Sequence, residues 1–266
     1  MKIKNVIMMG LVMGSLCSCE YSYNFAGNYI SYSDADKYSI GDFTYNGDDI
    51  DTIDLEWVSG SISVTKGNDL SSLSVKENVN GNELLEEQKL HYYIHDSVLS
   101  IQYCASGYDL NIDCASKKLN LEIPDGITFN IDTVSSPVTF TGESVSFKSM
   151  ELNSVSASMT FNGKVNIDES LKIDTVSGNS VFTSVKANDM ELNSTSGSFD
   201  IGVDTCPDIK GGSVSGDYTF NMLNKQSVSV SFSSVSGRRI DSYTPEDNSM
   251  VTKFDISTVS GSLNIK

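Results

Sequence analysis

Serine is the chemically active residue that this sequence repeats most regularly. The phrase Val-Ser-Gly, or a close variant of it, occurs eight times, and its central positions from Val134 to Val259 are spaced by 21, 21, 19, 19, 21 and 24 residues. A nucleophilic serine needs an adjacent base, and no Gly-x-Ser-x-Gly turn is present in the sequence. We therefore predict that the repeated serines are structural and not catalytic.

The two histidines are the next candidates, because His91 and His95 would share a metal if they lay on a helix. Apolar residues alternate through this segment at Leu90, Tyr92 and Ile94, which indicates a strand. Four residues along a strand span about 13 Å, too far for one zinc ion. We predict no metal site and no cofactor.

Acidic residues offer a weaker possibility of cation binding. The segment from Asn46 to Asp54 is acidic but lacks the residue order of an EF-hand loop, so a solvated loop is favoured over calcium binding. One outward position of the repeat alternates acid and amide in the order Asp132, Asn153, Asp174 and Asn193. Such a column could hold cations between repeats, or the asparagines could simply dilute like-charge repulsion.

Arginine and cysteine supply the remaining candidate sites. Arg238 and Arg239 are adjacent and could contact an anion or a sugar, or could form a solvated corner. Cys104 and Cys114 flank a turn-like centre, so a hairpin bridged by a disulfide competes with two separate thiols. Cys206 has no evident partner in this pattern.

The N-terminus has the order of an export signal. Lys2 and Lys4 precede a short apolar run from Val6 to Leu16, and Leu16-Cys17-Ser18-Cys19 resembles the lipobox of bacterial lipoproteins. The resemblance implies cleavage of residues 1–18 and acylation of Cys19, with palmitate as a typical chain. The protein is then expected in the cell envelope, facing outside the cytoplasm and attached to the membrane by lipid. Loss of the two lysines takes the formal charge from −17 to −19, which argues against nucleic-acid partners.

The elements that carry these residues follow from the repeat itself. With the central residue of each phrase as position zero, apolar residues recur at positions −5 and −3, and again at +4 and +6 in most copies, as in Met150/Leu152 and Met159/Phe161. This alternation predicts strand, bend and strand in every copy. An antiparallel meander or sandwich is the alternative, but identical residues in the same register favour an all-β parallel β-solenoid with rungs of roughly 20 residues.

Two further features of the repeat have a structural reading. Glycine follows the serine in most copies, and its tolerance of positive φ suits a sharp bend. Position −1 is Ser or Thr from Thr133 to Thr258, which predicts a stacked hydroxyl ladder that bonds between rungs or to the backbone of the bend.

The repeat also divides the chain. After the signal peptide we expect a tether over 19–33, an irregular β region or cap over 34–126 and a regular solenoid over 127–266, with 34–266 forming one continuous domain. The chain ends on the strand Leu263–Ile265, so we expect an uncapped end there, to which a partner or a neighbouring copy could add.

A family resemblance rests on Leu119-Asn120-Leu121-Glu122-Ile123-Pro124-Asp125-Gly126, the following Phe129-x-Ile131-x-Thr133-Val134-Ser135 and the serial Val-Ser-Gly strands. This pattern resembles the bacterial "putative adhesin" family known as DUF4097. The resemblance covers roughly residues 50–266 and implies an exported or membrane-tethered β-strand repeat. It supplies no catalytic residue, because that family has no established activity.

Together these features predict a membrane-anchored, non-enzymatic, adhesin-like binding or scaffold module with an unidentified protein or glycan ligand. An envelope sensor or assembly partner of a membrane protein is the alternative. A carbohydrate-active solenoid enzyme is less favoured, because the sequence holds two histidines and few arginines.

Overall fold

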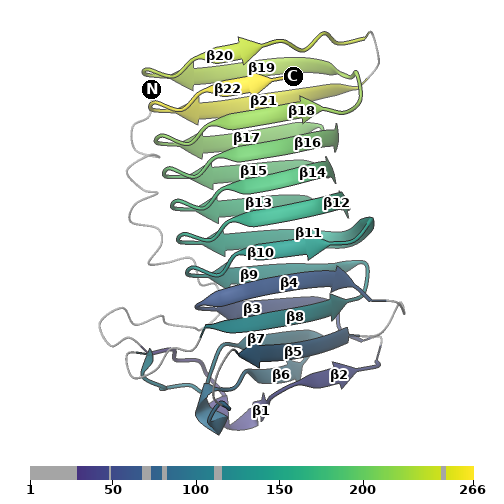
Figure 1. Ribbon diagram of the computed structural model, residues 1–266. Helices are drawn as coiled ribbons and strands as arrows, with labels where there is room; N and C mark the ends of the chain where they lie inside the picture. The colour runs from purple at the N-terminus through teal and green to yellow at the C-terminus, as the bar shows by residue number, and fades with distance from the viewer. Residues whose placement is uncertain (1–28, 48, 68–72, 80–82, 111–115, 247–249) are drawn as a thin grey trace.

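The computed structural model describes residues 29–47, 49–67, 73–79, 83–110, 116–246 and 250–266. Within these residues the named elements are β-strands and two 3-10 helices of one turn each, Ala35–Lys37 and Glu86–Gln88. All strands belong to one sheet of 22 strands (Figure 1). The predicted all-β fold is confirmed, but the sheet is mixed and not wholly parallel.

Two long parallel ladders make up most of this sheet. The first ladder runs, in spatial order, through β7 (Val98–Gln102), β3 (Thr52–Trp57), β9 (Ile127–Thr133), β11 (Ser144–Ser154), β13 (Ser170–Thr175), β15 (Asp189–Ser194), β17 (Asp208–Ser213), β21 (Val251–Thr258) and β19 (Ser227–Ser234). The second ladder runs through β8 (Lys117–Ile123), β4 (Gly60–Lys66), β10 (Val138–Thr141), β12 (Met159–Ile167), β14 (Ser180–Lys186), β16 (Phe199–Thr205), β18 (Tyr218–Met222), β22 (Leu263–Ile265) and β20 (Arg239–Asp241). One strand from each ladder forms a rung, and in most rungs the Val-Ser-Gly bend joins the two strands.

The core lies between the two ladders, because the alternating apolar residues of both point inward. Leu171 and Ile173 of β13, at positions −5 and −3, are fully buried and pair in register with the same positions of the adjacent rungs. The ladders touch across the core, where the ring centroids of Phe220 and Phe254 lie 4.9 Å apart. The sequence period therefore sets both the register along each ladder and the contact between the ladders.

The spatial order of the rungs differs from chain order at both ends of the stack. The rung β7–β8 lies outside the rung β3–β4, although it comes later in the chain. At the other end, β21–β22 lies between β17–β18 and β19–β20. The prediction that Leu263–Ile265 forms an uncapped end was wrong, because β22 has a neighbour on both sides.

Side-chain polarity explains why the last rung of the chain occupies the interior place. Leu263 and Ile265 stand at the core positions +4 and +6 of their rung, and both are fully buried. The same positions in the preceding rung hold Arg239 and Asp241, which pair in register with Leu263 and Ile265. Burying that pair between two rungs would carry a large desolvation cost, so the charged rung lies at the end.

An antiparallel cap closes the N-terminal end. β5 (Leu73–Val79) pairs with β8 and with β2 (Phe43–Tyr45), while β6 (His91–His95) pairs with β7 and with β1 (Ser39–Ile40), all antiparallel. Ile30 and Tyr32 are 3% and 5% exposed in this cap. The folded part therefore begins before residue 34, inside the segment that the sequence suggested as a tether.

Glycine at the bends is required by space and not by a positive φ. A Cβ on Gly178, Gly197 or Gly216 would lie 1.7, 2.1 or 2.0 Å from a carbonyl oxygen of the neighbouring rung. Among the described bend glycines, only Gly60 of the first copy has a positive φ, of 107°. The predicted reason was therefore wrong, although the bend itself is where the sequence placed it.

Candidate functional site

The Ser and Thr hydroxyls at position −1 of the repeat are hydrogen-bonded at the bends, as the sequence analysis predicted. Ser194 and Ser213 each donate to the carbonyl oxygen three residues later, at 2.6 and 2.7 Å, and both side chains are buried. Thr175 instead accepts from the backbone N–H of Gly178 at 2.9 Å and from the hydroxyl of Ser154 at 2.8 Å. These hydroxyls are hydrogen-bonded within the fold and have no base positioned to activate them.

The outer serines of the same phrase tie each rung to its neighbour. Ser156 and Ser177 each donate from the hydroxyl to a carbonyl oxygen of the preceding rung at 3.3 Å, and Ser196 repeats the contact. They form an exposed column along one corner of the stack. The column is regular, but its hydroxyl protons are used in the rung-to-rung bonds.

The outward column of acids and amides is also hydrogen-bonded from rung to rung. Asn153 Nδ2 donates to Asp132 at 2.9 Å, and Asn193 Nδ2 donates to Asp174 at 3.0 Å. The amides therefore separate the carboxylates, as one of the two sequence interpretations proposed. Within the described residues no group of three or more His, Cys, Asp or Glu side chains is arranged to hold a metal ion.

One position breaks this alternation of acid and amide. Glu56 of β3 lies directly opposite Asp132 of β9, so two carboxyl groups are neighbours. Burial and, to a smaller extent, the negative charge of Asp132 together raise the pKa of Glu56 to about 7, while a hydrogen bond from Gln102 opposes the shift. Burial also raises the pKa of Asp132. The pair is poised to hold a proton near neutral pH, a feature that sequence reasoning missed.

The histidines lie on a strand, as predicted. His91 is buried, with Nδ1 3.0 Å from the carbonyl oxygen of Lys89, and burial lowers its pKa. His95 is exposed and lies 3.1 Å from Asp96. The two side chains have separate partners at opposite ends of β6.

The predicted lipidation and disulfide residues lie largely outside the described part of the chain. Cys19 and Cys114 are both outside it, so acylation and the Cys104–Cys114 bridge stay predictions. Cys104 is buried in the cap, where its backbone carbonyl accepts from the hydroxyl of Tyr32 at 3.1 Å. Burial raises the pKa of the Cys206 thiol to about 12, so this side chain is unreactive at neutral pH.

The arginine pair belongs to the outermost rung at the C-terminal end. Arg239 forms an ion pair with Asp241 at 2.7 Å, and the side chains are 39% and 32% exposed. Arg238 is exposed, and its backbone N–H donates to the Ser262 hydroxyl at 3.3 Å. A ligand contact by either arginine stays a prediction, and Arg239 would have to share its charge with Asp241.

A second charged pair lies at the opposite end of the stack. Lys117 is 1% exposed, and its ammonium group lies 2.9 Å from Glu77, 2.7 Å from the carbonyl oxygen of Gln88 and 4.9 Å from the Trp57 ring centroid. A charged residue at a core position of β8 was visible in the sequence. Its partner was not, because Glu77 lies 40 residues away on an antiparallel strand.

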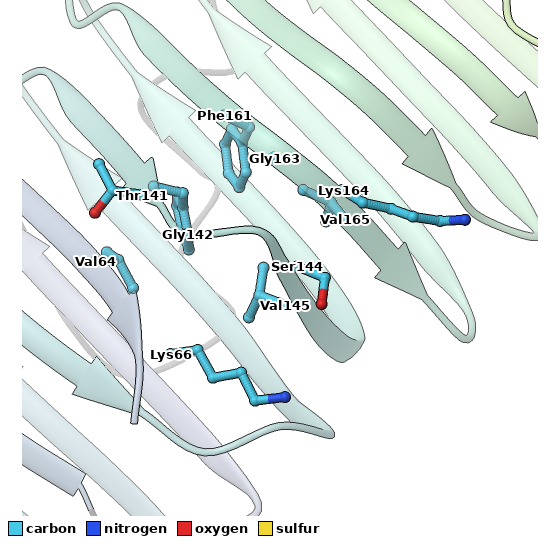
Figure 2. Close-up of a pocket in the computed structure, with 11 residues that line it drawn as sticks. Val64, Lys66, Thr141, Gly142, Ser144, Val145, Phe161, Gly163, Lys164 and Val165 are labelled. Atoms are coloured by element: carbon cyan, nitrogen blue, oxygen red, sulfur yellow. The ribbon is translucent and has the colours of Figure 1, made fainter. Parts of the chain in front are cut away.

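The hollow at the bend between β10 and β11 is too small for a ligand (Figure 2). Its volume is about 10 Å³, room for roughly one water molecule. Phe161 and Val145 line it, and the ammonium groups of Lys66 and Lys164 extend from its rim (Figure 2). Lys66 pairs with Asp125, and Lys164 pairs with Asp204 at 2.7 Å, so their charges are already compensated.

The part of the chain that the structure describes holds no helix long and apolar enough to cross a membrane.

Comparison with known proteins gives distant structural likenesses, among them three to bacterial proteins. No family model matches the sequence, and no curated protein matches it. A "putative adhesin" from Bacteroides fragilis is similar with a TM-score of 0.47 and 13% identity, covering 86% of this chain and 97% of that one. A "putative adhesin" from Parabacteroides distasonis gives a TM-score of 0.47 and 14% identity, with coverage of 85% and 97%. A "putative cell adhesion protein" from Clostridium sporogenes gives a TM-score of 0.34 and 13% identity, with coverage of 86% and 99%.

Proposed function

We propose that this protein is an exported bacterial lipoprotein whose β-solenoid, of the DUF4097 type, serves as a non-enzymatic, adhesin-like binding or scaffold module. The observation that carries the proposal is the use of the repeated polar groups within the fold. The hydroxyls of Ser194, Ser213 and Thr258 bond to the bends, and the amide of Asn153 bonds to a neighbouring carboxylate. Groups that are satisfied in this way make a rigid surface and leave no nucleophile with its base.

A screen for activity tests the non-enzymatic part. The purified protein is incubated with a broad panel of polysaccharides, and release of reducing or unsaturated ends is measured. We expect no release above a buffer control. Activity that is lost on Arg238→Ala would contradict the proposal, because Arg238 is exposed and its loss should not disturb the core.

The lipid anchor is a separate part of the proposal, supported by the lipobox-like order before Cys19. Cells that make the full chain are fed a palmitate analogue, and the labelled protein is compared between wild type and Cys19→Ala. Labelling should be lost in the variant. Cys17→Ala is the matched control and should keep its label, whereas equal labelling of all three proteins would refute the anchor.

The alternative function is that of an envelope sensor or assembly partner, and the C-terminal end of the stack favours it. Val235 and Ile240 of the outermost rung, formed by β19 and β20, are 67% and 55% exposed. Crosslinking in intact cells, followed by purification, separates the two functions. A glycan or host ligand would support the adhesin-like module, and a membrane protein of the same cell would support the sensor.

A further inference from the structure

The rung formed by β19 and β20, here called the end rung, presents an open sheet edge. Within the described residues no strand pairs with the outer side of β19 or β20, whereas their inner sides pair with β21 and β22. β19 runs from Ser227 to Ser234 without a charged residue or a proline. Long, uncharged edges of this kind readily pair with another strand.

The end rung also leaves part of the core uncovered. Val230 and Phe232 of β19 are in register with Phe254 and Ile256 of β21 and face the core in the same way. Phe254 and Ile256 are 2% and 1% exposed, but the two residues of β19 are only partly buried. One further layer would complete their burial.

The N-terminal end shows how this fold covers such a layer. There, the inward-pointing Lys117 pairs with Glu77, and the two side chains are 1% and 7% exposed because β5 and β6 pair antiparallel with the outermost rung. The inward-pointing pair of the end rung, Arg239 and Asp241, has no such cover and is 39% and 32% exposed. Both ends of the stack carry an inward-pointing charged pair, and only the pair at the N-terminal end is covered by further strands (Figure 1).

We propose that the end rung pairs with the end rung of a second copy of this chain, antiparallel and about a two-fold axis through Ile240. Antiparallel pairing of Arg239-Ile240-Asp241 with itself sets Arg239 opposite Asp241 of the second copy, and the reverse. Each charge then has two partners of opposite sign, which offsets the desolvation cost that a single ion pair would carry between two rungs. β19 brings no charge of its own into the contact. Charge complementarity thus fixes both the direction and the register of the pairing.

The contact would end at a dimer. At the N-terminal end the edge strands of the described cap, β1 and β2, are only 2 and 3 residues long, so a paired molecule offers there no second edge as long as β19. An end of roughly 27 by 20 Å would bury on the order of 1,000 Å² in total, the lower limit of a specific interface. We therefore expect association in roughly the micromolar range.

The pairing has a consequence that rests on the proposed lipid anchor. The described chain begins at Tyr29 in the cap, at the end of the stack opposite β19 (Figure 1). Two copies joined end to end therefore hold their caps, where the described chain begins, at opposite extremes of the dimer. If each copy is anchored through Cys19, the dimer links two separate membranes.

Disulfide trapping tests the pairing directly. The full chain carrying Ile240→Cys is purified in detergent and oxidised, and covalent dimer is measured on a non-reducing gel against wild type. Opposed Cβ atoms in antiparallel strands lie about 4.5–5.5 Å apart, within reach of a disulfide after a small adjustment. Val181→Cys is the matched control, because Val181 is 45% exposed in the middle of the stack. We expect at least about tenfold more dimer from Ile240→Cys than from Val181→Cys.

Charge exchange tests the register. In the Ile240→Cys background, Arg239→Asp sets two acids opposite each other and should lower the trapped dimer about tenfold. The exchange Arg239→Asp with Asp241→Arg should restore it, and thermal melts confirm that all variants fold. Equal trapping at Ile240 and Val181 would overturn the proposal. The Arg239–Asp241 pair would then serve to keep the open sheet edge of a monomer from pairing with another strand. A yield of trapped dimer that is the same with and without the charge substitutions would overturn the proposed register. Trapping in detergent without bridging of vesicles that carry the lipidated chain would refute only the link between membranes.

Discussion

Replacing Glu56 by Gln should stabilise the protein at neutral and alkaline pH. Glu56 lies opposite Asp132 on the outward side of the first ladder, and Asp54 adds a second negative charge nearby. Gln102 donates to the Glu56 carboxyl group. A glutamine keeps the acceptor for Gln102 and adds an N–H that can donate to Asp132, as Asn153 does from the other side.

The sign and size follow from the pKa of Glu56. Its pKa rises from 4.5 to about 7 on folding, mainly because the carboxyl group is buried. The unfolded chain therefore loses this proton at lower pH than the folded chain does. As the pH rises from 4.5 to 7, this difference lowers the free energy of unfolding. Above pH 7 the ionised Glu56 destabilises the folded state by its full amount, about 3 kcal/mol. Below pH 4.5 both states are protonated and the cost disappears.

Urea unfolding at pH 5 and pH 8, followed by circular dichroism, measures the effect. Glu56→Gln should raise the free energy of unfolding at pH 8 by about 2–3 kcal/mol and change it little at pH 5. Glu122→Gln, at an exposed position of β8, is the matched control and should change stability by less than about 0.5 kcal/mol at either pH. If Glu56→Gln equals wild type at pH 8, the ionised carboxyl group of Glu56 carries no cost in the folded state and the argument fails.

Three further substitutions probe the bends, the cap and the rung order, each by urea unfolding. Gly197→Ala should lower the free energy of unfolding by about 2–3 kcal/mol, because the added Cβ would lie 2.1 Å from a carbonyl oxygen. Gly212→Ala is the control and should be nearly neutral, because the nearest atom lies 3.3 Å from its added Cβ. Equal losses would show that the close approach at Gly197 does not matter. Lys117→Met should lower the free energy of unfolding by about 3–5 kcal/mol, because it leaves Glu77 buried and unpaired. The further substitution Glu77→Leu should recover most of that stability. A double variant that loses the sum of the two single losses would contradict the pairing. Leu263→Arg should lower the free energy of unfolding by at least about 4 kcal/mol and speed the hydrogen exchange of backbone amides in β21 and β22. Unchanged exchange would show that a rung inside the stack tolerates a charged side chain at this position.

The periodicity of the sequence was sufficient to predict the core residues but not the polar contacts between strands. Apolar residues at fixed positions predicted which side chains are buried, because strand alternation is a local property. The contact between Glu56 and Asp132 joins strands that are 76 residues apart in sequence, across the stretch in which the repeat is interrupted. Nothing within either segment identifies the other as its neighbour, so the raised pKa of Glu56 could not be predicted.

The bends show a similar division between what is local and what is not. A glycine after Val-Ser marks a bend in the sequence, but two explanations fit it equally well: a positive φ, or a lack of space for a side chain. The carbonyl oxygen that excludes a Cβ at Gly216 belongs to Gly197 of the neighbouring rung. Only stacking reveals that contact, and only the structure could decide between the two explanations.

The order of rungs at the C-terminal end was accessible in principle, and the reason lies in side-chain chemistry. Each copy of the repeat brings side chains to core positions +4 and +6, and an interior rung must fill both with groups that tolerate complete burial. The copy with Leu263 and Ile265 meets this condition, and the copy with Arg239 and Asp241 does not. A stack that followed chain order would bury an ion pair and leave two apolar side chains at the edge. Exchanging the two rungs avoids both costs, which together amount to several kcal/mol. Chain order is therefore a default for a repeat protein, and charged residues at core positions mark the rung that must lie at an end.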